Sequence, residues 1–248
     1  MTAMRAHAGT EIFRVLGQKM LVTYHRPAGR DGQRFPTVLF LHGFPGSEKS
    51  SDVQRALMAR GIASVAPSFL GAWGSGGKYR FTTLVPQARA ALRAAKRLSF
   101  VDSKRIAVYG FSMGGWTALN LATLEPALKA VVAVAPCGGP EMIGPQNRSF
   151  LAHLSKPLNA PAPAALELDF RRAMRRFDPA LAIPRLRAPL LLIHGDEDET
   201  IPPAISKRYA ALAGKRARLA VLRGADHGFL DCREKLKRLA SDWLSSRV

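Results

Sequence analysis

Short apolar runs alternate with longer helix-forming segments over most of this chain, and the alternation limits the folds that it can adopt. Runs that are apolar at almost every position are typical of strands in a parallel sheet that is covered on both faces. Six such runs occur, at residues 37–41, 62–66, 106–109, 130–135, 190–193 and 219–222. Segments with helical character lie between or after them, at 50–60, 84–98, 116–124, 204–212 and 233–244.

This order predicts a doubly wound α/β layer in which helices cross over from one parallel strand to the next. Two further β-rich stretches, 12–16 and 20–25, are separated by Gly17 and predict an antiparallel hairpin ahead of the parallel strands. The expected architecture is a mostly parallel sheet of about eight strands with helices on both faces. Functional residues then belong at the carboxyl ends of the strands.

A single domain over residues 1–248 is expected, because a chain of this length with 47% apolar residues can bury one large core. Segment 137–184 interrupts the alternation with closely spaced prolines, followed by a charged amphipathic stretch at 166–177. It is too long for an ordinary connection and predicts a small cap or lid insertion over the site. The alternative is a surface excursion with no role in binding.

The sequence predicts no targeting segment and no role for its two cysteines in a disulfide framework or a metal site. Neither the first nine residues nor any later segment has an apolar run long enough for a signal-peptide core or a membrane span. We expect a cytoplasmic protein without a membrane partner. Cys137 and Cys232 are too few for a disulfide framework and lack metal-site spacing, which favours two reduced thiols over one bridge.

The formal net charge of +19 raises the question of an anionic partner. Basic residues are spread along the chain without a basic tail, which favours solvated surfaces over a functional patch. We therefore expect no nucleic-acid partner. One narrower hypothesis concerns a cluster in the proposed cap, which would attract an acidic substrate: Arg171, Arg172, Arg175 and Arg176.

The strongest single motif is a G-x-S-x-G sequence at 110–114, placed directly between an apolar run and a helical segment. In this setting a tight strand-to-helix turn holds the serine in a strained backbone and exposes its hydroxyl. The positive end of the helix dipole lies beneath it. Ser112 is the predicted nucleophile.

A serine hydroxyl needs a base to remove its proton, and histidine has a suitable pKa. Of the six histidines, His227 follows the last apolar run and precedes the last helix, where a loop reaches back to the nucleophile. His42 and His194 each precede a glycine at the end of a strand, and structural packing is their expected role. His227 is the predicted base.

The third residue must be an acid that holds the imidazole of the base. A loop after the strand at 190–193 carries Asp196 and Asp198, and either gives the chain order serine, acid, histidine that is expected of α/β-hydrolases. Spacing does not choose between these two. Asp226 is a weaker candidate, because it is adjacent to His227 in sequence.

An oxyanion requires preorganised backbone N–H groups. Met113 follows the nucleophile at the head of its helix, and the glycine-rich loop at 42–46 follows the first parallel strand. Within that loop Phe44 is the natural donor, since Pro45 has no N–H. Phe44 and Met113 are the predicted oxyanion hole.

Together, the segments 42–46, 110–115, 194–202 and 226–229 resemble the α/β-hydrolase superfamily over nearly the whole chain. Within it the sequence looks most like the catalytic domains of peptidase S9 (prolyl oligopeptidase) and dienelactone-hydrolase relatives, including feruloyl-type esterases. The glycine-rich run at 71–77 is similar to a loop of such proteins. The resemblance implies that Asp198 is the triad acid and that Phe44 and Met113 bind the oxyanion.

Two departures from these relatives limit what the resemblance implies. Peptidases of the S9 group carry a large N-terminal propeller, for which this chain has no room, and dienelactone hydrolases use a cysteine where this sequence has Ser112. The resemblance therefore supports the fold and the triad more strongly than the substrate.

The expected activity is that of an intracellular carboxylesterase acting on a small-molecule ester through an acyl-enzyme on Ser112. This chemistry requires neither a metal nor an organic cofactor. Peptidase or acyltransferase activity on the same triad is the nearest alternative, and a non-catalytic or anion-binding protein on a hydrolase scaffold is a remote one. We expect a monomer or a homodimer.

Overall fold

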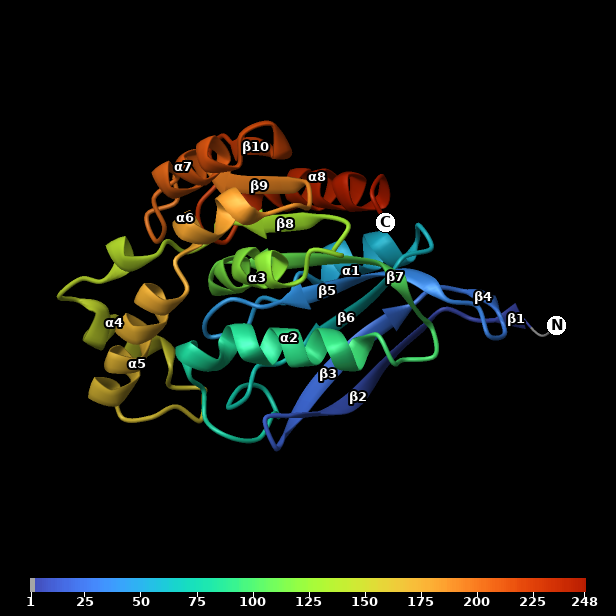
Figure 1. The fold of residues 1–248 in the computed structure, drawn as a ribbon, viewed down its shortest axis with the longest axis horizontal. Helices are drawn as coiled ribbons and strands as arrows, with labels where there is room; N and C mark the ends of the chain where they lie inside the picture. Colours follow the sequence, from blue (N-terminus) through green and yellow to red (C-terminus); the bar gives the residue numbers. More distant parts are fainter. Residues whose placement is uncertain (1–2) are drawn as a thin grey trace.

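A single eight-stranded sheet forms the centre of the molecule in the computed structural model, which describes residues 3–248 (Figure 1). In their order across the sheet the strands are β10 (Ala217–Leu222), β9 (Leu190–Gly195), β8 (Val131–Val134), β7 (Val101–Phe111), β5 (Phe35–Leu41), β6 (Ala63–Pro67), β3 (Gln18–Arg26) and β2 (His7–Val15). The six strands from β10 to β6 pair in parallel. Strands β3 and β2 add an antiparallel hairpin. The predicted mostly parallel sheet and its hairpin are confirmed.

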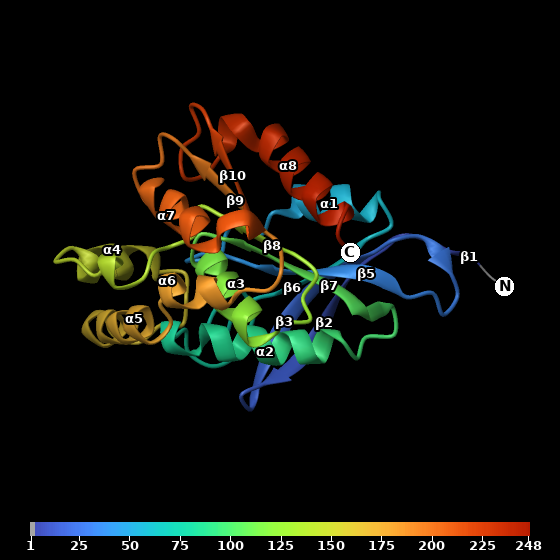
Figure 2. The same cartoon turned by 45° about the horizontal axis from the view of Figure 1, so that its top comes forward.

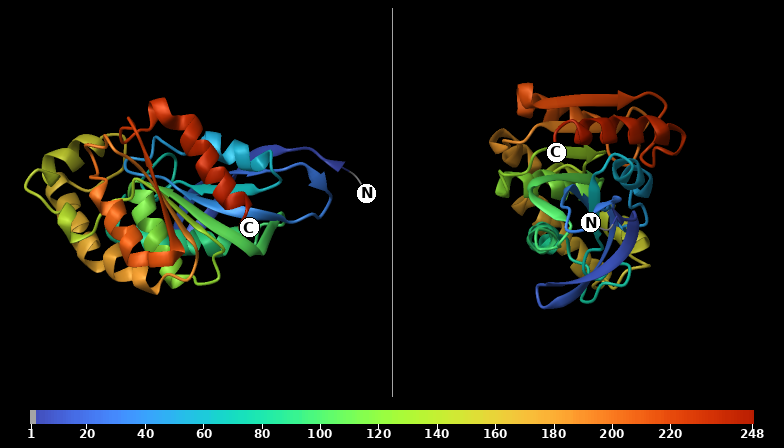
Figure 3. Two further views of the ribbon diagram at one scale, coloured as in Figure 1. Left: turned by 90° about the horizontal axis from the view of Figure 1, so that it is seen from above. Right: turned by 90° about the vertical axis from the view of Figure 1, so that its right-hand side faces the viewer.

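Helices cover both faces of this sheet (Figure 3). On β5, Val38 and Phe40 belong to the core beneath α1 (Ser51–Met58) and α8 (Arg233–Ser245). Leu39 and Leu41, which alternate with them, belong to the core beneath α2 (Leu84–Ala95), α3 (Met113–Leu124) and α7 (Ala204–Ala213). Successive side chains of a strand point to opposite faces, and both faces are buried here. This explains why the parallel strands are apolar at consecutive positions.

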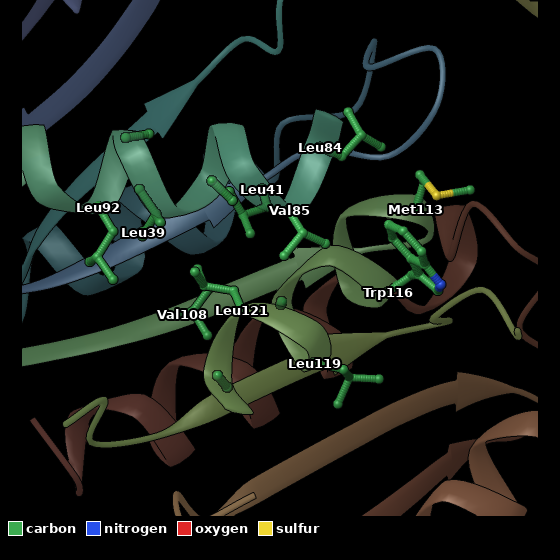
Figure 4. Close-up of a cluster of buried hydrophobic side chains, with 14 of the residues drawn as sticks. Leu39, Leu41, Leu84, Val85, Leu92, Val108, Met113, Trp116, Leu119 and Leu121 are labelled. Carbon is green, nitrogen blue, oxygen red and sulfur yellow. The ribbon is translucent and has the colours of Figure 1, made fainter. Parts of the chain in front are cut away.

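Helix α3 is the most deeply buried helix of the layer. Figure 4 shows Trp116 and Leu121 of α3 in the cluster that α2 and the strands β5 and β7 complete. Buried residues occupy α3 continuously from Met113 to Ala122. A helix that is apolar on every side is suited to the inside of a layered domain.

The last strand departs from the expected pattern. Strand β10 lies at the edge of the sheet, and Val221 is 42% exposed. The expectation of burial on both faces is wrong for the run 219–222, because an edge strand has a neighbour on one side only. A second, two-stranded sheet of β1 (Ala3–Met4) and β4 (Gly29–Arg30) was also not expected.

The interrupting segment 137–184 contains three helices, α4 (Asn147–Leu154), α5 (Pro163–Arg176) and α6 (Pro179–Ala182). Helices α4 and α5 lie together at one end of the molecule, opposite the end that holds β1 (Figures 1 and 2). The amphipathic stretch at 166–177 corresponds to most of α5. The short helix α4 was not predicted, since prolines surround it.

Hydrogen bonds tie this segment to the chain that follows β6. The Tyr79 amide donates to the Asn159 carbonyl at 2.8 Å, and the Asn159 amide donates to the Gly71 carbonyl at 2.8 Å. Within α5, Asp169 accepts a bond of 2.5 Å from the Thr82 hydroxyl. The position of α5 relative to residues 71–82 is therefore held by both backbone and side-chain contacts.

Cys137 and Cys232 are both buried and unbridged, as predicted. Met1 and Thr2, which belong to the first nine residues where no signal-peptide core is expected, lie outside the described residues. Between residues 3 and 248, no helix has both the length and the apolar character of a membrane span.

We predict that Leu121→Ala lowers the free energy of unfolding by about 2–5 kcal/mol, because Leu121 is fully buried and its loss leaves a cavity. Leu124→Ala, the same change on the same helix, is the matched control. Leu124 is 46% exposed, and its change should cost less than about 1 kcal/mol. Urea denaturation of both variants measures the difference. Equal losses would contradict the packing described for α3.

Candidate active site

Ser112 lies in the turn that joins β7 to α3. Its backbone angles are φ 54° and ψ −119°, an uncommon conformation for a residue with a side chain. The flanking glycines allow the turn. A Cβ at Gly114 would lie 1.9 Å from the Leu41 carbonyl oxygen, and one at Gly110 would lie 2.1 Å from the Gly114 carbonyl oxygen. The motif thus lets α3 approach the backbone of β5.

Three of the residues predicted from the sequence form a continuous hydrogen-bonded chain. The Ser112 Oγ lies 3.1 Å from His227 Nε2, and His227 Nδ1 lies 2.7 Å from Asp198 Oδ2. Their positions along the chain are far apart, in the loops after β7, β9 and β10. With the imidazole protonated on Nδ1, the hydroxyl donates to Nε2 and the ring donates to the carboxylate.

Asp198 is surrounded by donors. Its Oδ1 accepts hydrogen bonds from the backbone amides of Thr200, at 3.0 Å, and Ile201, at 2.8 Å. Burial alone would raise the pKa of Asp198, but hydrogen bonds from His194, His227 and the Ile201 amide outweigh it. They hold the pKa well below its usual range. The carboxylate is therefore ionised at neutral pH.

The two other candidate acids have different partners. Asp196 accepts from the Gly224 amide at 2.7 Å, and Asp226 accepts from the Phe229 amide at 2.7 Å. Both stabilise the loops that carry the acid and the base. The structure brings Asp198 to His227, where sequence spacing alone had left Asp196 open.

The histidines expected to pack structurally do so. In His42 the Nδ1 lies 2.7 Å from the Gly43 carbonyl, and the Nε2 accepts from the Phe69 amide at 3.0 Å. His194 is fully buried, with both ring nitrogens in contact with polar groups. Neither ring reaches Ser112 as a base would have to.

The predicted oxyanion donors lie beside Ser112. A Cβ at Gly43 would be 3.1 Å from the Ser112 Cβ, so the 42–46 loop runs directly past the serine. Trp73, in the glycine-rich run, donates from its indole N–H to the Pro45 carbonyl at 2.8 Å and holds this loop. In the described part of the chain, the amides of Phe44 and Met113 donate to no protein group. Both are therefore available to a ligand.

An apolar cavity of about 270 Å³ opens next to Ser112. Four phenylalanines form much of its wall: Phe44 from the loop after β5, Phe81 from the turn before α2, Phe150 from α4 and Phe170 from α5. The Phe81 ring contacts the rings of Phe44 and Phe170. Its lining residues are Phe44, Phe81, Ser112, Met113, Cys137, Met142, Asn147, Phe150, Leu151, Leu154, Phe170, Thr200, Ile201 and His227. Over residues 3–248, no Lys, Arg, Asp or Glu contributes to this lining.

The hypothesis that the cap arginines meet an acidic substrate is not supported by their positions. None of the four lines the cavity. Arg171 pairs with Glu167 at 2.8 Å, and Arg176 stacks over the Phe177 ring. Arg171 and Arg176 therefore serve contacts within and around α5.

Several lining residues were missed from the sequence, since nothing local marks them. Phe81 and Phe170 come from segments separated by many residues and meet only through folding, with ring centroids 5.2 Å apart. Cys137 lies with its Sγ 3.9 Å from the Ser112 Oγ. Burial raises the pKa of the Cys137 thiol to about 12, so it is a neutral wall group at physiological pH.

Among residues 3–248, no group of three or more His, Cys, Asp or Glu side chains is arranged so that it could hold a metal ion.

We predict that His42 makes the fold acid-sensitive. Burial, and to a smaller extent the charge of Lys49, lowers its pKa from 6.5 to about 4, although the contact with the Gly43 carbonyl acts in the opposite direction. Its contribution is complete above pH 6.5 and is lost as the pH falls toward 4, about 3 kcal/mol in all. His42→Asn should flatten the fall in unfolding free energy between pH 6.5 and 4. The exposed His153→Asn is the control, and equal pH slopes in both variants would refute the role of His42.

The sequence matches a known protein family. The profile of the prolyl oligopeptidase family, Peptidase_S9, matches residues 50–245. An uncharacterised Mycobacterium tuberculosis protein is 29% identical over 193 residues, covering 77% of this chain and 63% of the relative. Esterase FrsA of Salmonella paratyphi B is 32% identical over 147 residues, covering 56% of this chain and 34% of the relative. The chain thus spans less than two thirds of these relatives.

Among solved structures, Est1E from Butyrivibrio proteoclasticus with bound ferulic acid is similar in fold. It has a TM-score of 0.77 at 20% identity, covering 96% of this chain and 98% of that one. The predicted α/β-hydrolase fold is confirmed by this likeness. The chain belongs to the prolyl oligopeptidase family, peptidase S9, and has the α/β-hydrolase fold.

Proposed function

We propose that this protein is a carboxylesterase in which Ser112 is the nucleophile, His227 the general base and Asp198 the residue that orients the base. The observation that carries the proposal is the hydrogen-bonded chain from Ser112 through His227 to Asp198, with contacts of 3.1 and 2.7 Å, at the wall of an apolar cavity. A nucleophile, a base and an orienting acid within hydrogen-bond reach are the requirements of acyl transfer.

Acylation is the first half of the proposed reaction. His227 Nε2 takes the Ser112 proton as Oγ attacks the ester carbonyl, and Asp198 stabilises the resulting imidazolium. The amides of Phe44 and Met113 stabilise the oxyanion. His227 then donates its proton to the leaving alcohol, and the carbonyl carbon stays bonded to Ser112 Oγ.

Deacylation repeats these steps with water. His227 takes a proton from water as its oxygen attacks the acyl-enzyme, and the carboxylic acid leaves when the proton returns to Ser112 Oγ. The strained backbone of Ser112 keeps its hydroxyl directed toward the base through both halves.

The cavity indicates the class of acyl group. Its wall is apolar and rich in phenylalanine, and its volume of about 270 Å³ suits a mid-sized uncharged group such as an aromatic or short branched acyl chain. The bound ferulic acid of Est1E, an aromatic acid, supports this class by analogy. We propose esters of apolar acids as substrates.

The same lining supports a role for the 137–184 segment as a cap. Helix α4 contributes Asn147, Phe150, Leu151 and Leu154 to the cavity, and α5 contributes Phe170. A surface excursion with no role in binding would leave the cavity wall to the sheet and its loops. We therefore propose that this insertion shapes the acyl site.

Activity on p-nitrophenyl esters tests the proposal. Ser112→Ala should abolish turnover and labelling by a fluorophosphonate probe. Asp198→Asn should lower kcat about 10³–10⁴-fold, because the amide favours the wrong imidazole tautomer. Asp196→Asn is the matched control and should retain most activity, since it bonds only the Gly224 amide. Wild-type protein that neither hydrolyses the esters nor accepts the probe would refute the proposal.

Peptidase activity is the second candidate, because the family profile is that of prolyl oligopeptidases. The cavity favours esterase over peptidase activity. Over the described residues, no carboxylate lines it to pair with the α-ammonium of a peptide amino terminus. A buried ammonium without a partner is costly.

We predict that kcat/KM for p-nitrophenyl butyrate exceeds that for an aminoacyl p-nitroanilide by at least about 100-fold, the equivalent of some 3 kcal/mol. An N-acetylated anilide separates the cost of the ammonium from that of the amide bond. Comparable values for the ester and the free aminoacyl anilide would favour the peptidase.

A further inference from the structure

We propose that His194, held by Ser206, is a positioning residue for Asp198: it supplies a second imidazole N–H that fixes the carboxylate and shares its charge. The inference rests on the proposed function, because Asp198 matters through the orientation of His227. It assigns a purpose to a buried polar pair that the proposed reaction does not otherwise use.

A second histidine, His194, lies close to the Asp198 carboxylate. His194 lies near the end of β9, with its Nε2 3.2 Å from Asp198 Oδ2 and 2.9 Å from the Ile201 carbonyl oxygen. Both side chains are fully buried. Asp198 Oδ2 also accepts from His227 at 2.7 Å, so one carboxylate oxygen lies between two imidazoles.

The protonation of His194 follows from its neighbours. Its Nε2 faces two acceptors, Asp198 Oδ2 and the Ile201 carbonyl, and a bare lone pair there would be repelled by both. On the other side, Nδ1 lies 2.6 Å from the hydroxyl oxygen of Ser206 on α7. The Ser206 hydroxyl donates to Nδ1, which leaves the ring proton on Nε2, where the Ile201 carbonyl at 2.9 Å and the Asp198 carboxylate at 3.2 Å share it.

N–H groups then surround both carboxylate oxygens of Asp198. The amides of Thr200 and Ile201 donate to Oδ1, and His227 donates to Oδ2. The N–H of His194, shared with the Ile201 carbonyl, lies 3.2 Å from Oδ2. Rotation of the carboxylate would break several of these bonds at once, in a site that water does not reach. The geometry offered to His227 is therefore fixed.

The N–H of His194 also weakens the attraction between the Asp198 carboxylate and His227. A carboxylate oxygen that already accepts from His194 is a weaker acceptor for His227 than one that faces it alone. The titratable groups facing Asp198 are His194 on β9, His227 in the loop before α8, and Cys137 after β8. The Cys137 thiol is neutral, since burial raises its pKa to about 12, so the two rings are the groups that set this balance.

Kinetics of p-nitrophenyl ester hydrolysis test the proposal. His194→Leu should lower kcat about 10-fold to 100-fold, the loss of one hydrogen bond to a charged group, with KM changed less than about twofold. The acidic limb of kcat/KM should move to higher pH, because Asp198 then holds the protonated His227 more strongly. His194→Gln, whose amide N–H lies near the original Nε2, should restore much of kcat. Ser206→Ala should show the same changes at smaller size.

Ser241→Ala, which removes another buried serine hydroxyl from α8, is the control and should leave the pH profile unchanged. In folded His194→Leu and Ser206→Ala protein, an acidic limb that stays in place or moves to lower pH overturns the proposal. Where His194→Leu does not fold, His194→Gln and Ser206→Ala decide by the same criterion.

A proton NMR signal separates this proposal from the esterase assignment. The Nδ1–H of His227 bonded to Asp198 should give a low-field resonance that His227→Ala lacks. It should shift in His194→Leu and Ser206→Ala and stay in place in Ser241→Ala. A wild type without ester turnover refutes the proposed function, yet this resonance still tests the positioning role. A resonance that none of the variants moves overturns it.

Discussion

The backbone contact between α3 and the end of β5 is the constraint on which the rest of the site depends. Gly114 allows α3 to pass so close to the Leu41 carbonyl that no side chain fits between them. That approach puts Ser112 at the carboxyl edge of the sheet, next to the 42–46 loop. For the same reason Phe44, Ser112 and Met113 line one cavity.

Parallel topology explains how residues far apart in the sequence meet at this edge. Strands β5, β7, β9 and β10 all end on the same side, and the loops that follow them carry Phe44, Ser112, Asp198 and His227. The loops also brace one another: Asp196 accepts from the Gly224 amide, which joins the loop of the acid to that of the base. The sheet sets the distances, and these loop contacts hold the side chains in place.

The sheet, its hairpin and the residues at its edge could be predicted from the sequence because each has a local signature. Ser112 lies in a motif whose glycines are required by backbone contacts, and His227 follows the last strand. The choice of Asp198 over Asp196 required three dimensions, because both lie in one loop and differ only in their partners. The cavity wall had no local signature, since Phe81 and Phe170 meet through packing between distant segments. The exposure of β10 likewise follows from its place at the edge, which apolar content does not reveal.

Residues 71–82 contact the 42–46 loop through Trp73. They contact the inserted segment through Gly71 and Tyr79, which bond Asn159, and through Thr82, which bonds Asp169 of α5. One stretch of chain therefore supports two segments: the 42–46 loop, which is proposed to stabilise charge, and the 137–184 insertion, which is proposed to shape the cavity. None of these hydrogen bonds involves α4. We therefore expect insertions or substitutions within α4 to change the size of the cavity without moving the Phe44 and Met113 amides. Under the proposed function, changes in ligand preference are thus separated from the residues proposed to perform the chemistry.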